Sequence, residues 1–436
     1  MTKEKAIYII GGGPLGLNVI RWATELGLKT IVTDKNEQAP GFELADECFI
    51  ADGSDTRPHV SFARNLVATC DIVGVYCGSE FGLQTIFTLS RMLELEHNPY
   101  DAIASVLDKV RMKRIWRQHD IPTPEAVAVA DGAALSKLVA QKGTLVVKPA
   151  RGSGSRGVQI VNRDSDFDQI FEHCQQSVEG EGEVIAEPFV AGRLIDANGV
   201  FIENEFFPAG VLEKFTTPFP DCLPIGGYDP AAVPAEEATE VYQLLERACR
   251  ALGLTFGPVK GDFVRSTTGY QVLEVAPRLH GDVSTSNTLP YGTGINPVKF
   301  YFKYLAHGVI DEALLRPGHK AYATFRVICL PPGNDYASLQ NHDFGSHDRI
   351  TKIWFNPKYR AENKRYTNTA HIPGYICACG KNQAEAETVL EQFFLSNFLD
   401  RHYEVADKEW YTRLGESIES AGLSKKSMGY WEKACL

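Results

Sequence analysis

The sequence has 436 residues, of which 44% are hydrophobic and 23% are charged, and its formal net charge is −11. This length and composition predict a globular protein of roughly two to four domains. The negative charge disfavours general binding to nucleic acid or to an anionic membrane, because both are negatively charged themselves. The segment MTKEKAIYIIGGG is unlike a secretory signal and no apolar run is long enough to span a membrane, so we expect a cytoplasmic protein with small-molecule partners.

The first part of the chain is predicted to form a Rossmann-like α/β domain. AIYIIGGGPLGLNVIRWATELGLKTIVTDKN reads as a buried strand, a glycine turn, an amphipathic helix and a second strand that ends in Asp34. CDIVGVYCG then predicts another strand and FGLQTIFTLSRMLEL another helix. Alternating strands and helices are typical of a parallel sheet, so residues 1–100 are expected to be one unit.

The glycine turn of this unit, GGGPLGLNV at residues 11–19, resembles the dinucleotide-binding fingerprint. Its glycines let the backbone approach a pyrophosphate at a helix N-terminus. Asp34 lies where an acid would bind a ribose hydroxyl, so a nicotinamide site is one interpretation. The glycines are equally compatible with a plain tight turn or with a cleft for a different small molecule.

Two further regions follow. The helix LDKVRMKRIWRQHD stops at IPTPE, where two prolines mark a break. From Ala126 onward short strands carry glycine loops, which predicts an antiparallel α+β region over residues 101–308, with a small lid at about 126–190 and a larger part over 191–308. Residues 309–436 are expected to form a C-terminal domain with two strands, a helix and a polar helical tail.

Four features suited to binding a nucleotide occur in order along the chain. Lys109 begins a helix, and Lys148 ends a strand before the loop ARGSGSRG, whose N–H groups and arginines are suited to closing over phosphates. Glu187 in AEPFV begins a segment suited to an adenine base. Asp262 and Glu274 lie on two strands joined by a tight turn, and facing carboxylates are suitable ligands for Mg²⁺. Each feature has an ordinary explanation alone, but together they make a complete Mg·ATP site.

On these residues the chain resembles the ATP-grasp enzymes, over roughly residues 5–395. The matching motifs are the DK at Asp108, then VVKPARGSGSRGV, EPFV, and GDFV with LEVAPRLHGD. Within that superfamily GPVKGDFVRSTTGYQVLEVAPRLHGD is similar to the L-amino acid ligases, and HIPGYICACGKNQAEAE resembles the C-terminal lid of ligases of the biotin-carboxylase type. The resemblance implies an α/β and α+β fold, with a Rossmann-like N-terminal domain, an ATP-grasp fold and a C-terminal lid subdomain.

The resemblance also implies roles for the matching residues. Lys109 and Lys148 would contact the ATP phosphates, Asp262 and Glu274 would bind Mg²⁺, and Arg278 would stabilise an acyl-phosphate. The other implied nucleotide-binding residues, from the loop, the hinge and the strand after it, are Arg151, Ser153, Gly154, Ser155, Glu187, Phe189, Val190 and Asp196. Two more residues are expected to take part in catalysis: Lys214 as a partner of a carboxylate or phosphate, and His280 as a general base.

Two positions depart from the pattern of the family. Ala276 stands where the family commonly has Asn, which removes one ligand to a second Mg²⁺, and water or Asp282 is the expected replacement. The segment GRLIDANG lacks an acid directly after its glycine, so Asp196 is the nearest candidate for a ribose or substrate contact.

The expected function is ATP-dependent joining of a carboxylate to an amine through an acyl-phosphate, with release of ADP and phosphate. This chemistry needs charge neutralisation and positioning more than a nucleophilic side chain. The alternatives are a bicarbonate-activating enzyme of the carboxylase type, a nicotinamide-dependent oxidoreductase and a non-catalytic ATP-binding regulator. The resemblance is compatible with a homodimer, since related enzymes are often dimers, and neither nucleic acid nor a membrane is an expected partner.

Overall fold

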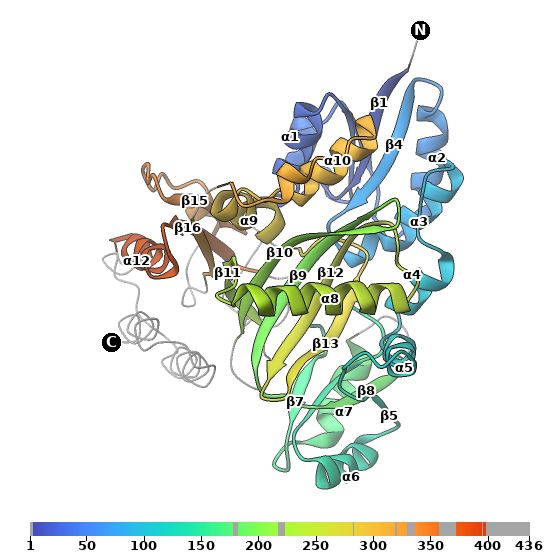
Figure 1. Cartoon of the computed structure of the whole chain (residues 1–436), viewed down its shortest axis with the longest axis vertical. Coiled ribbons are helices and arrows are strands. Elements are labelled where there is room, and N and C mark those ends of the chain that lie inside the picture. The colour runs from blue at the N-terminus through green and yellow to red at the C-terminus, as the bar shows by residue number, and fades with distance from the viewer. Residues whose placement is uncertain are drawn as a thin grey trace.

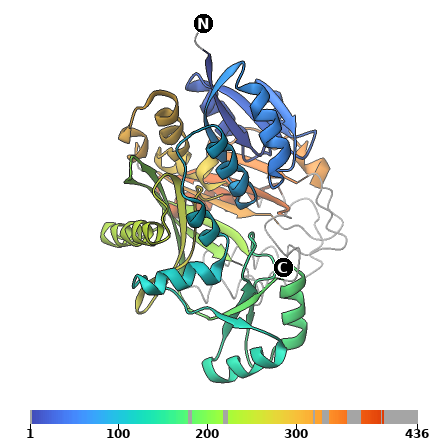
Figure 2. The ribbon, with the colours of Figure 1, turned by 90° about the vertical axis from the view of Figure 1, so that its right-hand side faces the viewer.

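The computed structural model describes residues 3–177, 182–216, 223–281, 283–318, 321–328, 336–356, 372–394 and 396–397. These residues form three sheets, with the N-terminal sheet at one end of the molecule, a small sheet at the other and a large sheet between them (Figure 1). Figure 2 shows the same order of sheets from the side. Within the described ranges, no helix combines the length and the apolar character that a membrane span requires.

The N-terminal sheet is parallel and covered by helices on both faces. Its strands lie in the order β3 (Glu47–Ile50), β2 (Lys29–Asp34), β1 (Glu4–Ile10) and β4 (Cys70–Cys77). One face packs on α1 (Leu17–Glu25) and on α10 (Pro297–His307), and the other on α2 (Thr56–Leu66) and α3 (Leu83–Met92). Because both faces of β1 are buried, its sequence is a nearly continuous apolar run.

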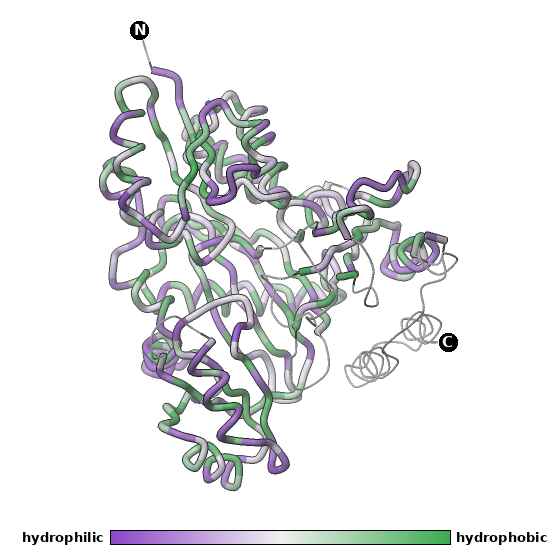
Figure 3. Tube along the Cα trace, turned by 180° about the vertical axis from the view of Figure 1, so that it is seen from behind, coloured by the Kyte–Doolittle hydropathy of each residue, from purple (hydrophilic) through white to green (hydrophobic). Residues whose placement is uncertain are grey.

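The small sheet is antiparallel and carries its helices on one face. Its order is β5 (Val127–Val129), β8 (Val184–Pro188), β6 (Leu145–Pro149) and β7 (Gln159–Val161). The helices α6 (Gly132–Lys142) and α7 (Phe167–Gln176) pack their apolar sides on it, and along both helices hydrophobic and hydrophilic residues alternate (Figure 3). The open face of this sheet is the one from which Lys148 and Glu187 project.

The large sheet has eight antiparallel strands. Their order is β13 (Gly269–Ala276), β12 (Gly257–Ser266), β9 (Arg193–Ile202), β10 (Glu205–Thr216), β11 (Pro224–Asp229), β14 (Tyr322–Val327), β16 (Gly374–Gly380) and β15 (Ile350–Phe355). The long helix α8 (Ala235–Ala251) covers one face with the main hydrophobic core beneath it. The remaining elements are η1 (Pro40–Leu44), η2 (Glu80–Gly82), α4 (Tyr100–Val106), α5 (Lys109–Gln118), η3 (Ser284–Thr288), α9 (Leu289–Thr293), η4 (Glu312–Leu315), α11 (Tyr336–Gln340) and α12 (Gln383–Phe394).

The expected fold class is confirmed: a parallel α/β sheet precedes antiparallel α+β structure. The strands that follow residue 309 add to the sheet formed by β9 to β13, so this sheet continues across the expected boundary at residue 308. Long-range pairing of this kind joins β11 to β14, which are about a hundred residues apart in sequence and leave no local signal for each other. The expected helical tail and Asp282 lie outside the described residues.

Candidate active site

Two carboxylates face each other across the ladder between β12 and β13. Asp262 and Glu274 are Cα partners in the antiparallel register, and the ladder bulges directly after Asp262. Their sequence neighbours Phe263 and Val275 are buried in the core under α8, so the alternation of side chains turns both carboxylates to the opposite face of the sheet. Asp262 is 24% exposed and Glu274 is 25% exposed, which leaves both accessible to a ligand.

Lys260 lies between these two carboxylates. Its Nζ is 2.8 and 3.0 Å from the two oxygens of Asp262 and 3.5 Å from Oε1 of Glu274. Burial opposes ionisation of Glu274, but Lys109 and Lys260 outweigh it and lower the pKa of this carboxyl to about 2. The pKa of Asp262 is likewise lowered, because Lys214 and Lys260 outweigh its burial. Both groups are therefore ionised at neutral pH, which is the state that a divalent cation requires.

Lys109 connects the carboxylate pair to the glycine loop. It is the first residue of α5, whose N-cap Asp108 accepts a hydrogen bond from the N–H of Arg111. Lys109 Nζ lies 3.6 Å from Oε2 of Glu274 and donates to the carbonyl oxygen of Gly152 at 2.8 Å. The same lysine therefore lies at the carboxylates and beneath the loop that was expected to bind phosphates.

The loop between β6 and β7 has an unusual backbone. Gly152, Gly154 and Gly157 have φ of +124°, +70° and +67°, and Ser155 has φ of +57°. Glycine adopts these angles without the strain that a side chain would bring. Arg151 is exposed and forms an ion pair of 3.2 Å with Asp108, and the residues from Gly152 to Arg156 are exposed or half-buried, Ser153 and Ser155 included. The loop is thus open to solvent beside Lys109, and its shape depends on glycine.

Glu187 is buried between two lysines. Its Oε1 lies 3.0 Å from Nζ of Lys148 and 3.2 Å from Nζ of Lys113, which also donates to the hydroxyl of Thr123 at 3.0 Å. Burial lowers the pKa of Lys113 to about 8. The sequence reasoning missed Lys113, although its spacing of four from Lys109 puts both on one face of α5 and its neighbours Met112 and Trp116 are core residues.

The hinge residues that follow Glu187 lie at the edge of the small sheet. The N–H of Phe189 donates to the carbonyl oxygen of Thr144 at 3.0 Å, so this N–H is already used by the protein. Phe189 and Val190 are both half-buried. Both side chains are therefore partly accessible, and their expected contact with an adenine base stays a prediction.

Asp196, Lys214 and His280 form a buried cluster beside Asp262. Lys214 Nζ is 2.6 Å from Oδ2 of Asp196 and 3.8 Å from Oδ1 of Asp262. His280 Nε2 lies 2.7 Å from the same Asp196 oxygen, and its Nδ1 lies 3.1 Å from the carbonyl oxygen of Gly281. Burial opposes ionisation of Asp196, but Lys214 and His280 together lower its pKa well below the usual range.

This cluster contains a group of possible metal ligands. One ligand atom from each of Asp196, Asp262 and His280 lies within 4.8 Å of the others. Lys214 Nζ already pairs closely with Asp196, so a cation bound at Asp262 has less to gain from the Asp196 carboxylate. Both ring nitrogens of His280 face acceptor oxygens. The geometry therefore favours His280 as a hydrogen-bond donor that orients Asp196, and disfavours it as a general base.

Arg278 follows β13 and reaches across to the N-terminal unit. It pairs with Glu80 of η2, and its Nη1 donates to the carbonyl oxygen of Leu279 at 2.9 Å. Among the described residues, the buried Nε of Arg278 has no hydrogen-bond partner. The sequence reasoning also missed Glu80, although it follows the carboxyl end of β4, the edge of a parallel sheet where ligands bind.

Polar groups of the N-terminal glycine turn form hydrogen bonds within the protein. Oδ2 of Asp34 accepts a hydrogen bond from the N–H of Gly12 at 2.9 Å, and Oδ1 accepts one from the N–H of Asn36 at 2.8 Å. From the C-terminal region, Lys352 Nζ donates to the carbonyl oxygen of Pro14 at 3.1 Å. Asp34 therefore holds its own turn together, which disfavours the ribose role that a nicotinamide site requires.

Comparison with known proteins gives a consistent family. The ATP-grasp domain family matches residues 106–282. The D-alanine–D-alanine ligase of Ralstonia nicotianae is 30% identical over 186 residues, which cover 38% of this chain and 53% of that protein. The matched parts span about half the length of such curated relatives, at 44% and 53% of two of them.

Two solved structures share the fold. The L-amino acid ligase from Bacillus licheniformis has a TM-score of 0.72 at 19% identity and covers 90% of this chain and 98% of its own. The biotin carboxylase domain of the 2-oxoglutarate carboxylase from Hydrogenobacter thermophilus, solved with MgADP, ADP and bicarbonate, has a TM-score of 0.72 at 15% identity and covers 100% and 99%. At these identities the likeness concerns the fold.

Proposed function

We propose that this ATP-grasp protein is an ATP-dependent carboxylate–amine ligase. The observation that carries the proposal is the facing pair Asp262 and Glu274, with Lys109 and Lys260 against it and the glycine loop tied to Lys109. Such a site concentrates positive charge and two oxygen ligands at one place, which is what the triphosphate of ATP and its metal ion require. ATP with Mg²⁺ is the typical cofactor pair of this family.

The site supports a reaction in two steps. A carboxylate oxygen of the acid attacks the γ-phosphorus of ATP, the bond to ADP breaks, and an acyl-phosphate forms. The amine then attacks the acyl carbon, the C–O bond to phosphate breaks, and the amide is released with phosphate and the amine proton. Both steps are limited by negative charge on phosphate oxygens, so fixed cations lower the barrier without forming a covalent bond.

The residues of this chain divide the work. Lys109, Lys148 and the N–H groups of the loop after Lys148 bind the phosphates, and Arg278 binds the acyl-phosphate as it forms. Two ionised oxygen donors fit Mg²⁺, so Asp262 and Glu274 would hold it, where it supplies further neutralisation of phosphate charge. The cluster of Asp196, Lys214 and His280 lies beside Asp262, and its lysine helps to keep the Asp262 carboxyl ionised.

The test is ADP release with paired amino acids as acid and amine, followed by mass spectrometry of the product. The proposal predicts ADP formation that depends on both an acid and an amine, and an amide product lighter than the sum of the two by one water. ADP release that needs neither substrate contradicts the proposal, because it is plain ATP hydrolysis. No release over a broad panel although ATP binds also contradicts it and favours a non-catalytic regulator.

A bicarbonate-activating reaction is the second candidate. It is favoured by the relation to a biotin carboxylase domain solved with bicarbonate, which matches the whole of this chain. Bicarbonate has a carboxylate that the same phosphate site could activate. ADP release that depends on bicarbonate and not on an amino acid would select this reaction over the ligase.

A further inference from the structure

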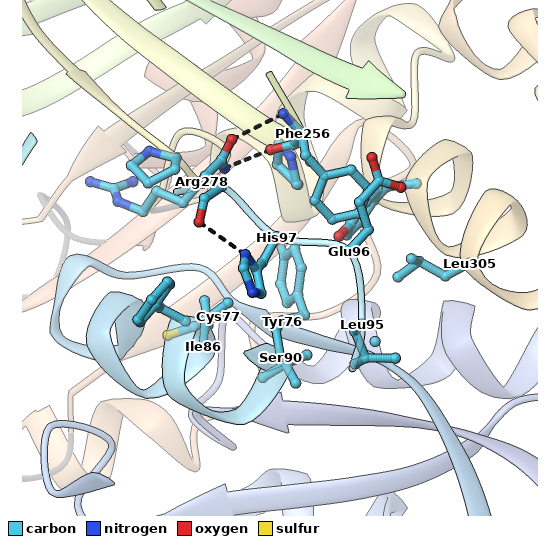
Figure 4. Close-up of a pocket in the computed structure, with 18 of the residues that line it drawn as sticks. Tyr76, Cys77, Ile86, Ser90, Leu95, Glu96, His97, Phe256, Arg278 and Leu305 are labelled. Carbon is cyan, nitrogen blue, oxygen red and sulfur yellow. Dashed lines mark hydrogen bonds between the residues drawn. The ribbon is translucent and has the colours of Figure 1, made fainter. Parts of the chain in front are cut away.

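A cavity of about 350 Å³ lies behind Arg278, at the junction of the N-terminal unit and the large sheet. Its wall includes β4, which is the edge strand of the N-terminal sheet, together with α3, the start of β12 and the end of α10. This volume lies in the range of ligand-binding sites for small molecules. Arg278 and Leu305 lie on opposite sides of the cavity (Figure 4).

The body of the cavity is apolar. Val75, Leu83, Ile86, Phe256 and Leu305 line it, and Val75, Leu83 and Phe256 are buried. Of the polar groups at the wall, Asn98 is already engaged: its side chain donates to the carbonyl oxygen of Phe256 and accepts from the N–H groups of Thr255 and Phe256. The apolar side chains of this part favour a ligand that presents hydrocarbon to them.

The rim of the cavity carries two carboxylates. Glu96 and Glu203 are exposed and come from different elements, the segment before α4 and the turn between β9 and β10. Among the described residues, neither of them forms an ion pair, although most acidic residues near the active site do. Glu96, Glu203 and Tyr304 line the same cavity. Burial and the charge of Glu203 raise the pKa of Glu96, and burial and both carboxylates raise the pKa of Tyr304.

The inner end of the cavity has the opposite character. Arg278 is nine-tenths buried there, with two nitrogens engaged by Glu80 and Leu279 and its Nε without a partner in the described part of the chain. Its charge is balanced by Glu80. The charges without a partner at this cavity are therefore the two acids at the rim.

We infer that this cavity binds an apolar primary amine, with the ammonium group between Glu96 and Glu203 and the hydrocarbon chain against Ile86 and Leu305. The site is separate from the phosphate and carboxylate groups of the proposed ligase, and its only shared residue is Arg278. A bound amine therefore occupies a cavity that is also lined by the arginine assigned to the acyl-phosphate, either as the tail of a substrate or as an effector.

The test is calorimetric titration of the full chain without ATP, using hexylammonium, hexan-1-ol and hexanoate. We expect hexylammonium to bind roughly tenfold tighter than the alcohol, because two carboxylates face its charge, and hexanoate to bind weakest. From butyl- to hexylammonium the affinity should rise about fourfold per methylene. Equal affinity for the ammonium and the alcohol, or no binding of either at millimolar concentration, would overturn the inference.

Variants locate the site. The double substitution Glu96→Gln with Glu203→Gln should weaken hexylammonium roughly tenfold and leave hexan-1-ol unchanged, and its exposed positions do not threaten folding. Leu305→Trp should remove binding of both by filling the cavity. Glu43→Gln removes an exposed acid from η1, away from the cavity, and should change nothing. Unaltered hexylammonium binding in the double variant would place the amine elsewhere.

This result is independent of the ligase proposal, because binding is measured without turnover. Hexylammonium that is also converted to an amide in the ADP-release assay is a substrate, whereas hexylammonium that changes the rate with another amine is an effector. Binding here with no ADP release under any condition would contradict the ligase and leave the amine site standing.

Discussion

Lys260 on β12 lies directly opposite Ala276 on β13, and its ammonium nitrogen lies between Asp262 and Glu274. In the resemblance to ATP-grasp enzymes, Ala276 stands at the position that implies an amide ligand for a second Mg²⁺. The ammonium of Lys260 already supplies positive charge to the two carboxylates that a second metal ion would otherwise neutralise. We therefore expect this protein to work with fewer metal ions and to depend on Lys260 instead.

Replacing Lys260 by Met should reduce ADP formation by about 100-fold to 1,000-fold, the range typical of losing one electrostatic group at a phosphoryl site. The physical reason is that Asp262 and Glu274 then repel each other and the phosphates. Raising Mg²⁺ should restore part of the rate, because a second ion can enter. Lys29→Met, which removes a surface ion pair with Glu47, is the matched control and should leave the rate unchanged. A rate in Lys260→Met equal to that of the unaltered protein would exclude the assigned role.

Lys148→Ala and Glu274→Ala should each abolish ADP formation while the protein stays folded. Lys148 is a phosphate ligand in the proposed site, and Glu187 keeps Lys113 as a partner after its loss. Glu274→Ala should not unfold the protein, because Lys109 and Lys260, which pair with Glu274, keep Gly152 and Asp262 as partners. ADP release and thermal unfolding followed by circular dichroism are the measurements, with the exposed Lys137→Ala as control. Turnover retained in either variant would refute the site assignment, and a non-catalytic regulator would show no turnover even before substitution.

Site residues that belong to a local sequence motif could be predicted from the sequence. Site residues that depend on contacts between distant segments could not. Asp262 and Glu274 were predictable because a tight turn joins their strands and fixes the register between them. Glu80 was not, because it meets Arg278 across an interface between segments nearly two hundred residues apart. The same reason hid the pairing of β11 with β14.

Lys113 should give the stability of the protein a specific dependence on pH. Burial lowers its pKa from 10.5 to about 8, so below that value the folded protein carries the full cost of burying an ammonium group. Between about pH 8 and 10.5 the folded protein loses this proton before the unfolded chain does, and stability contributed by this group rises with pH.

The measurement compares urea unfolding of the unaltered protein and of Lys113→Met between pH 7.5 and 10.5. Since each pKa unit corresponds to about 1.4 kcal/mol, the difference in unfolding free energy between the two proteins should change by about 3 kcal/mol over this window. Other titrating groups cancel because both proteins contain them. Parallel curves would show that Lys113 titrates normally in the folded state.

His280→Gln should lower the rate without changing the pH profile. Glutamine can still donate to Asp196, so a residue that only orients Asp196 is partly replaced. A general base would instead lose the ascending limb of the profile that reports its titration. The rate of ADP formation across the pH range decides between the two, with His280→Ala as the variant that lacks the donor. Loss of the limb in His280→Gln would restore the general-base assignment.

The glycine loop should be cut by trypsin, and nucleotide should protect it. Arg151 and Arg156 are exposed in a segment whose contacts with α5 are the bond from Lys109 to the carbonyl oxygen of Gly152 and the ion pair of Arg151 with Asp108, which leaves the backbone available to a protease. ATP with Mg²⁺ should slow cleavage at both arginines, because the loop then closes over the phosphates. Cleavage after Lys381, an exposed residue between β16 and α12, should proceed at the same rate with and without nucleotide.

The variant Gly152→Val, which forces a branched side chain into φ of +124°, should weaken protection by raising the concentration of ATP needed. Equal cleavage of the loop with and without ATP would show that it does not cover the nucleotide.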